Sequence, residues 1–358
     1  MTFAILLWEA ANCRICCIRY CLAKAITDVC WRRYRFGGTR EGRTVLLYRR
    51  RLRISSRGYN GTLVRPLRDI VTSNKSRISL NWSGAHVDQG KERNTGNCAL
   101  CGDLRILQDS HLIPSWAYRR LQQTEQGRDD PIQVSDGSAV QTSKQLKQYL
   151  LCSECETRFG VREDYVAGLT EIDATGRLNI LSKVNSFSLP NGAKAAELAS
   201  DIDTDKLAYF AASVVWRSHA MGLDCKLGED EPAFRRYLLE KSGLPSTAAI
   251  SMVILESSPL VAKPERYCTS PSSLEIPPMW LHGFTICGLA FRCFTGHSLD
   301  AQMKSLCLAG EGSKKYTFMI QAEELKDFLE VRRLSNAATP RGKLARRVAK
   351  PVKRNGPV

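Results

Sequence analysis

Two pairs of cysteines have the spacing of metal-binding loops: Cys98 and Cys101 in CALC, and Cys152 and Cys155 in CSEC. Each CxxC loop can place two thiolates on one tetrahedral zinc ion, and two loops complete a closed site with four sulfur ligands. We therefore predict a structural Zn²⁺ ion bound by these four cysteines. Buried thiols that pack in a core without a metal are the alternative.

A histidine follows the first loop in the stretch Ser110-His111-Leu112-Ile113-Pro114, and Asp109 lies two residues before it. The apolar pair and the proline after His111 predict a short extended segment that turns away from the histidine. A lone histidine in such a place is more often a half-buried structural side chain than a functional one. Its neighbours in the sequence therefore decide how it is interpreted.

Two carboxylates follow the second loop in CETRFGVRED, which we expect to be helical as far as about Leu169. Seven residues turn a helix by about 700°, so Glu156 and Glu163 share one face. Carboxylates on one face can hold a hard cation such as Mg²⁺ or Mn²⁺. The alternative is a solvated charged face, with Arg158 and Arg162 as neighbours.

These motifs together resemble the HNH (ββα-metal) endonucleases over residues 98–166. In that family a strand carries a motif similar to D-H-x-x-P, and a later C-x-x-C-N segment opens a helix. SHLIP at 110–114 matches the first motif, and LLCSECE at 150–156 matches the second. The pairing of SHxIP with LLCxxCE is more similar to a zinc-containing bacterial subgroup of HNH-like proteins.

The resemblance implies a divalent-metal-dependent endonuclease that hydrolyses nucleic-acid phosphodiester bonds. His111 is then the general base that activates water, and Glu156 takes the position of the family's asparagine. Glu163 takes roughly the place of the family's last histidine, as a ligand of Mg²⁺ or Mn²⁺, with Asp109 as a possible further ligand. Ser110 replaces the usual metal-binding residue of the strand, although Asp109 is adjacent, and glutamate in place of asparagine at 156 adds a negative charge that suits a divalent cation. The zinc ion would hold the strand and helix in register without taking part in the chemistry.

Two other functions fit the same residues. The first is a non-catalytic zinc module, a degenerate HNH domain that binds nucleic acid or a protein partner. The second is a regulatory protein in which the segment after residue 170 senses a ligand and the zinc domain is a scaffold. Metal content separates these classes, because a nuclease needs an exchangeable Mg²⁺ or Mn²⁺ besides the zinc.

The rest of the chain predicts an α+β protein with basic, disordered termini. We expect an HNH-like zinc domain at 91–170 and a helix-rich α+β companion domain at 171–334, because helices and strands lack a βαβ rhythm. Residues 335–358 have the composition of a disordered tail. Residues 1–90 show no lasting periodicity, and we interpret them as a disordered arm or as an over-extended start of translation. The third CxxC motif, in residues 13–16, is what chance supplies among 14 cysteines.

The companion segment contains candidate helices at 203–221, 231–242 and 321–333 and candidate strands at 249–256, 283–294 and 315–320. The polar stretch at 122–145 predicts a hairpin or a mobile loop between the two cysteine pairs, because it contains Asp-Pro and Asp-Gly turn signals. In the candidate helix at 203–221, Trp216 to His219 predict core with a polar edge. Lining of a nuclease cleft is the less favoured interpretation of these four residues.

The net charge of +16 is concentrated at the two ends of the chain. Residues 1–90 carry 17 Lys and Arg against 5 Asp and Glu, and residues 331–358 carry 9 basic residues and no acidic one. The middle is slightly acidic, so the charge alone is a weak argument for a nucleic-acid partner. The site motifs still favour nucleic acid, with DNA as the preferred form. No apolar run reaches about 18 residues, so we expect no membrane partner and a cytoplasmic protein. The resemblance to the bacterial HNH-like subgroup implies that the protein is bacterial.

Overall fold

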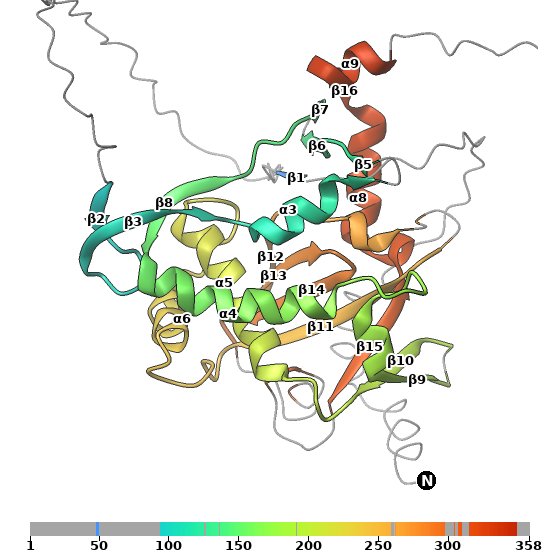
Figure 1. The fold of residues 1–358 in the computed structure, drawn as a ribbon. Coiled ribbons are helices and arrows are strands. Elements are labelled where there is room, and N and C mark those ends of the chain that lie inside the picture. The colour runs from blue at the N-terminus through green and yellow to red at the C-terminus, as the bar shows by residue number, and fades with distance from the viewer. Residues whose placement is uncertain are drawn as a thin grey trace, which may run out of the picture.

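The computed structural model describes residues 94–348, except 125–126, 136, 191, 259–260, 262, 298–303, 305–306 and 310–314, together with the backbone of Tyr48–Arg49. It is a mixed α+β structure (Figure 1), which confirms the predicted class. The interpretation of residues 1–90 lies outside the described residues, apart from those two.

A three-stranded antiparallel sheet carries His111 on one strand and the first cysteine pair in the turn between two strands. Its strands run in the order β2 (Thr95–Asn97), β3 (Leu104–His111) and β8 (Lys147–Cys152), and α4 (Ser153–Leu169) follows β8 directly. His111 pairs with Lys147, and a bulge lies between Gln108 and Asp109. The strand, returning strand and helix that carry the motifs therefore lie together, and the predicted helix after the second cysteine pair is confirmed.

The 35 residues between β3 and β8 form a helix and two hairpins. The elements are α3 (Ser115–Gln122), β4 (Gln123–Thr124), β5 (Gly127–Arg128), β6 (Ile132–Ser135) and β7 (Ser138–Gln141). The β6–β7 hairpin has Gly137 in its turn, with a φ of 72°. This is the hairpin that the Asp-Gly signal predicts.

A seven-stranded sheet forms the second layer, with the order β12-β13-β14-β11-β15-β10-β9. Only β11 and β15 run parallel to each other among its described pairs. The strands are β9 (Val184–Ser188), β10 (Lys194–Leu198), β11 (Ala249–Glu256), β12 (Ser272–Ile276), β13 (Met279–Ile286), β14 (Leu289–Thr295) and β15 (Tyr316–Gln321).

The helix α5 (Thr204–Ala220) is the centre of the molecule. All twelve residues from Leu207 to Ser218 are buried, as expected for a helix that is apolar on every side. It packs against β11 and β14 on one side and against α4 and α6 (Glu231–Leu238) on the other. Asp203 caps its first turn by accepting a hydrogen bond from the Lys206 backbone at 2.9 Å. This layering brings α5 between the large sheet and the helix that bears the two glutamates.

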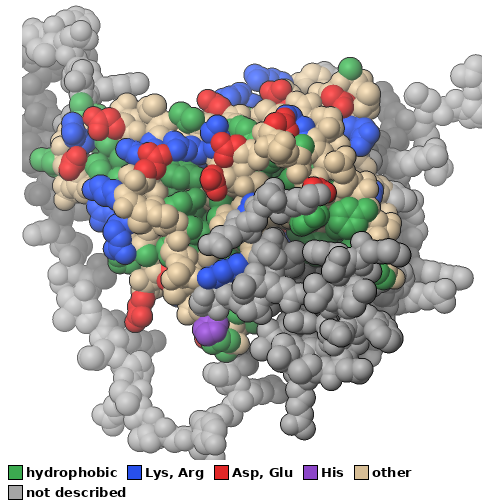
Figure 2. All heavy atoms as spheres, turned by 90° about the horizontal axis from the view of Figure 1, so that it is seen from below, with side chains coloured by type: hydrophobic (Ala, Val, Ile, Leu, Met, Phe, Trp, Pro, Cys, Tyr) green, Lys and Arg blue, Asp and Glu red, His purple; other side chains and the backbone are tan. Residues whose placement is uncertain are grey.

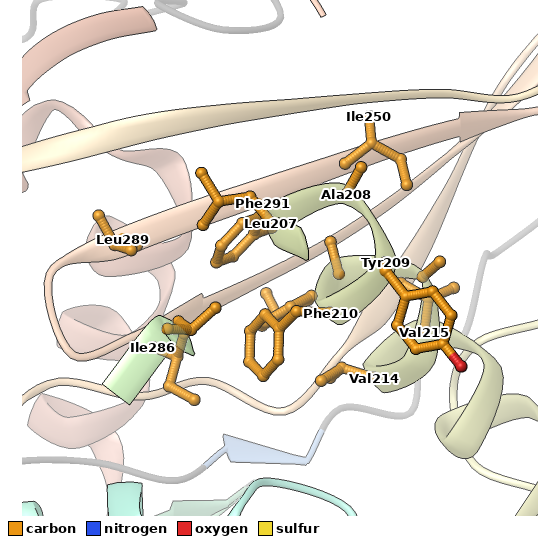
Figure 3. Close-up of a cluster of buried hydrophobic side chains, with 14 of the residues drawn as sticks. Leu207, Ala208, Tyr209, Phe210, Val214, Val215, Ile250, Ile286, Leu289 and Phe291 are labelled. Atoms are coloured by element: carbon orange, nitrogen blue, oxygen red, sulfur yellow. The ribbon is translucent and has the colours of Figure 1, made fainter. Parts of the chain in front are cut away.

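Aromatic side chains fill the contact between α5 and the sheet (Figure 3). Phe210 lies edge-on to Phe284 and Phe291, with ring centroids 6.1 and 5.5 Å apart, and Leu207 and Ile250 lie in the same cluster. The core that contains them also includes Leu112 and Phe159, from the segment before residue 170. The chain therefore shares buried contacts across that boundary, and the division into domains stays a prediction.

Two expectations about the companion segment need correction. The predicted strand at 283–294 is two strands, because Cys287 and Gly288 form a turn with φ values of 46° and 91°. Positive φ at both central residues is typical of a type I′ hairpin turn, and the surrounding apolar run hid it. The candidate helix at 321–333 is a short 3₁₀ turn, Ala322–Glu324, followed by α8 (Lys326–Ala337).

The prediction of a disordered tail is wrong for residues 335–348. After the end of α8, β16 (Thr339–Arg341) pairs with β7 in parallel, and α9 (Gly342–Val348) follows. Leu344 is buried beside Val134 and Val331. The basic residues of this segment find acidic partners, since Lys343 contacts Asp130 and Arg347 contacts Asp129 on the inserted segment. Residues 349–358 lie outside the described part.

Candidate metal centre and histidine site

The four cysteines of the two CxxC loops form one cluster, as predicted. Their sulfur atoms all lie within 4.8 Å of one another, and those of Cys101 and Cys152 are 3.9 Å apart. A tetrahedral zinc site with Zn–S bonds of about 2.3 Å needs sulfur atoms about 3.8 Å apart. The donor set and its spacing therefore fit a metal ion such as zinc. Within the described residues, no other group of three or more His, Cys, Asp or Glu side chains is close enough to bind a metal.

The first loop has the tight turn that such a site requires. The backbone N–H of Gly102 donates to the Cys98 carbonyl at 2.8 Å, and the N–H of Cys98 donates to the Asp103 carbonyl at 2.9 Å. Gly102 has a φ of 86°, which favours glycine over any other residue. From α6, the Arg235 guanidinium donates a hydrogen bond to the Leu100 carbonyl. A helix remote in sequence therefore supports the loop.

The second loop joins a strand end to a helix start. Cys152 is the last residue of β8 and precedes α4, and Cys155 lies in the first turn of that helix. The N–H of Cys152 donates to the Cys98 sulfur at 3.3 Å. The second loop therefore stabilises negative charge on the Cys98 sulfur.

The surroundings of the cluster favour the thiolate of Cys98 over those of Cys101 and Cys155. Burial opposes ionisation of Cys98, but backbone hydrogen bonds from Cys101, Cys152 and Leu100 outweigh it and lower its pKa to about 7. Burial raises the pKa of Cys101 to about 11 and raises the pKa of Cys155 as well. Four close sulfurs, three of them buried, cannot all be anionic without a cation, so the cluster has the electrostatics of a metal site.

His111 ends β3 with a half-buried side chain. Burial lowers the pKa of the imidazole from its ordinary value of 6.5. A side-chain hydrogen bond with Gln145 and the charges of Asp109 and Glu156 act in the opposite direction, while Lys147 adds to the lowering. The imidazole is therefore neutral near pH 7 and can accept a proton.

The two residues before His111 differ in role. Ser110 is 1% exposed, and its hydroxyl accepts a hydrogen bond from the backbone N–H of Leu151 at 3.3 Å, so it ties β3 to β8. Asp109 lies on the surface and forms an ion pair with Lys147 at 2.6 Å. An exposed pair of this kind contributes little to stability and can be displaced.

Glu156 and Glu163 lie on the same face of α4 as the buried Phe159, as their spacing predicts. One carboxylate oxygen of Glu156 is buried and has no hydrogen-bond partner among the described residues. Glu163 instead forms an ion pair with Arg217 at 2.6 Å, and the guanidinium is 1% exposed. The two glutamates are therefore not equivalent, because only Glu156 keeps a buried oxygen without a protein partner.

A shallow, open hollow of about 520 Å³ lies beside His111. It is lined by Ser143, Lys144, Gln145 and Lys147 from the end of the insertion and the start of β8. Gln145 is the hydrogen-bond partner of His111, and Lys147 is its neighbour across the strands. The hollow therefore presents two lysine side chains, and two of its lining residues, Gln145 and Lys147, are neighbours of His111.

No protein-family model, curated protein or solved structure matches this chain. In the described residues, no helix is long and apolar enough to cross a membrane. On the face shown in Figure 2, Lys and Arg side chains alternate with Asp and Glu. The described residues of that face therefore form no continuous basic field of the kind that attracts nucleic acid from a distance.

Arg217 is a residue of the site that the sequence analysis did not identify as functional. It stands in a stretch that the sequence predicts as core with a polar edge, and it is fully buried. Its signal was a cation in the mainly apolar part of the helix, after Leu207, since a buried charge requires a partner. The identity of that partner was not visible in the sequence.

Proposed function

We propose that this protein hydrolyses nucleic-acid phosphodiester bonds at a ββα site in which His111 is the general base. The observation that carries the proposal is the position of His111 at the end of β3, paired with β8 and acted on by Glu156 of α4. The HNH-like arrangement expected from the motifs is compatible with this strand–strand–helix order. The two lysines of the adjacent hollow suit a phosphate group.

His111 and the residues around it have different roles in the proposed reaction. The neutral imidazole takes a proton from a water molecule that attacks phosphorus, and the Gln145 hydrogen bond fixes the ring. Lys144 and Lys147 at the hollow offset the charge of the phosphate. Asp109 keeps Lys147 beside the imidazole through its ion pair.

A divalent cation fits this site through Glu156 more than through the predicted set of three carboxylates. Glu163 is held by Arg217 and Asp109 by Lys147, whereas Glu156 has a buried oxygen without a partner among the described residues. Mg²⁺ commonly binds through one or two carboxylates, with water and substrate phosphate as its other ligands. When bound, Mg²⁺ or Mn²⁺ would stabilise negative charge on the phosphate and the leaving oxygen.

The cysteine cluster has a structural role in this proposal. A zinc ion held by four sulfurs has no open position for a substrate. It joins the β2–β3 turn to the start of α4, and so fixes the helix that carries Glu156 relative to the strand that carries His111.

A second candidate function is a non-catalytic zinc module that binds nucleic acid or a protein partner. The ion pair of Glu163 with Arg217 favours it, because it removes a carboxylate from the predicted cation site. So does the finding that the cysteine cluster is the single candidate metal-binding group in the described part.

Plasmid nicking by the full-length protein separates the two. Supercoiled DNA is incubated with the zinc-loaded protein and Mg²⁺ or Mn²⁺, beside His111→Ala and a control variant, His297→Ala, at an exposed histidine. The nuclease proposal expects cleavage by the parent and by the control, and loss in His111→Ala. Equal cleavage by all three indicates a contaminant, and binding without cleavage favours the zinc module.

A further inference from the structure

Arg217 is a buried cation at the centre of the molecule. Its side chain is 1% exposed and lies on α5, between the large sheet and α4. Desolvating a guanidinium costs several kcal/mol unless it is paired and hydrogen-bonded. A helix that otherwise buries apolar residues therefore carries this arginine at a cost, and the contacts it makes show what it joins.

The guanidinium connects the two elements of the histidine site. One nitrogen donates to the carbonyl oxygen of His111 at 2.8 Å, and another contacts the Glu163 carboxylate at 2.6 Å. The guanidinium carbon, Cζ, lies 5.4 Å from the ring centroid of Phe159. Phe159 lies on α4 between Glu156 and Glu163 in the sequence. Arg217 therefore holds the end of β3 and the middle of α4 at one fixed separation.

We infer that Arg217 is a positioning residue, which sets the His111 imidazole relative to Glu156 by fixing the His111 backbone against α4. Glu163 then acts as the partner of Arg217. The inference rests on the proposed function, since it assigns Arg217 a role in the same site. It also explains why α5, outside the segment of residues 98–166, is needed to complete that site.

The chemistry of the contact requires arginine. The planar guanidinium presents donors at fixed angles, so it reaches a carbonyl and a carboxylate together. A lysine has one nitrogen on a flexible stem, and cannot hold both partners with the same geometry. Arg217→Lys therefore keeps the charge and removes the bridge.

The protein contains a matched control at Arg292. This arginine is also buried, donates to the Phe291 carbonyl at 2.9 Å and contacts the Asp327 carboxylate at 3.0 Å. It lies on β14, and among the described residues its hydrogen bonds go to Phe291 and Asp327 rather than to His111 or α4. Arg292→Lys thus loses the same kinds of contact without touching the histidine site.

The test measures kcat and KM for nicking by the full-length zinc-loaded protein and its Arg217→Lys and Arg292→Lys variants, with stability measured in parallel. We expect a fall in kcat of at least tenfold and a KM within about twofold for Arg217→Lys, and unchanged kinetics for Arg292→Lys. Equal kcat values for the two variants at a temperature where both are folded would overturn the inference. If Arg217→Lys does not fold, Glu163→Gln is used, and the same tenfold criterion applies.

A second readout does not depend on cleavage. Diethyl pyrocarbonate modifies accessible neutral imidazoles, and peptide mass spectrometry gives the rate at His111. We expect Arg217→Lys to raise that rate at least threefold over the parent, while Arg292→Lys leaves it unchanged. If the parent does not cleave nucleic acid but this difference is found, the proposed function fails and the positioning role stands. Equal rates in both variants would overturn the positioning role.

Discussion

Loss of one cysteine from the metal cluster should have a large and calculable effect on stability. A metal ion bound by Cys101 and Cys152 closes a loop of 51 residues. Loop closure of this length lowers the entropy of the unfolded chain by an amount worth about 4 kcal/mol at 25 °C. We therefore expect Cys101→Ala to lower the free energy of unfolding by about 4 kcal/mol, a large part of the stability of a typical domain.

Cys293→Ala is the matched control for this change. Cys293 is 1% exposed on β14 and lies outside the cluster. Its truncation removes one buried sulfur and should cost about 1 kcal/mol, the lower end of the range for core truncations.

Two measurements check the prediction. Zinc content is measured with a competing chelator present, and the free energy of unfolding is measured by urea titration. The parent and Cys293→Ala should each retain one zinc ion, whereas Cys101→Ala should lose it. Retention of a full equivalent by Cys101→Ala, or loss of zinc with unchanged stability, would refute the argument that the cluster cross-links the two loops.

Three further predictions test the histidine site, the C-terminal segment and the turn of the large sheet. Burial lowers the pKa of His111 from its ordinary value of 6.5, and the neutral imidazole is the base. In a pH profile of kcat/KM, cleavage should therefore fall with decreasing pH through a midpoint below 6.5. A midpoint above about 7 would contradict this. A hydrogen bond from Arg347 lowers the pKa of Asp129, so the contribution of this pair to the docking of α9 is present above the ordinary carboxyl range and is lost as the pH falls through the lowered pKa. Asp129→Asn should therefore speed hydrogen exchange in residues 342–348 at pH 7, and unchanged exchange would show that the pair is dispensable. Gly288→Ala should lower the free energy of unfolding in urea by about 2–4 kcal/mol, because the φ of Gly288 is 91° and a Cβ would lie 2.6 Å from Leu178. Gly137→Ala is the control, with open space around the added Cβ, and should cost about 1 kcal/mol. Equal costs for the two variants would be inconsistent with this packing.

The sequence was sufficient for features that depend on neighbours along the chain. The two CxxC loops are short-range structures, and their spacing predicts the close sulfurs found in the cluster. The helical period placed Glu156 and Glu163 on one face of α4, and the bounds of α5 and β11 follow from continuous apolar runs. Local geometry and hydrophobic pattern are enough for such features, because they do not depend on the rest of the fold.

The sequence was insufficient where a residue's partner is remote. The tail after residue 335 has a disordered composition, but acidic residues of the inserted segment pair with Lys343 and Arg347, and β7 pairs with β16. The turn at Cys287–Gly288 lies inside an apolar run without a polar signal, so only the returning strand reveals it. In each case the free energy comes from contacts between distant segments, and no local pattern encodes them.

The candidate site shows the same division. The residue types and spacing determined which side chains could bind a metal ion or accept a proton: the four cysteines, His111 and the glutamates of α4. Only the tertiary structure decided how the carboxylates are used, because Arg217 approaches from α5 and takes Glu163 as its partner. A buried charge must be paired, and the fold alone determines which opposite charge lies within reach.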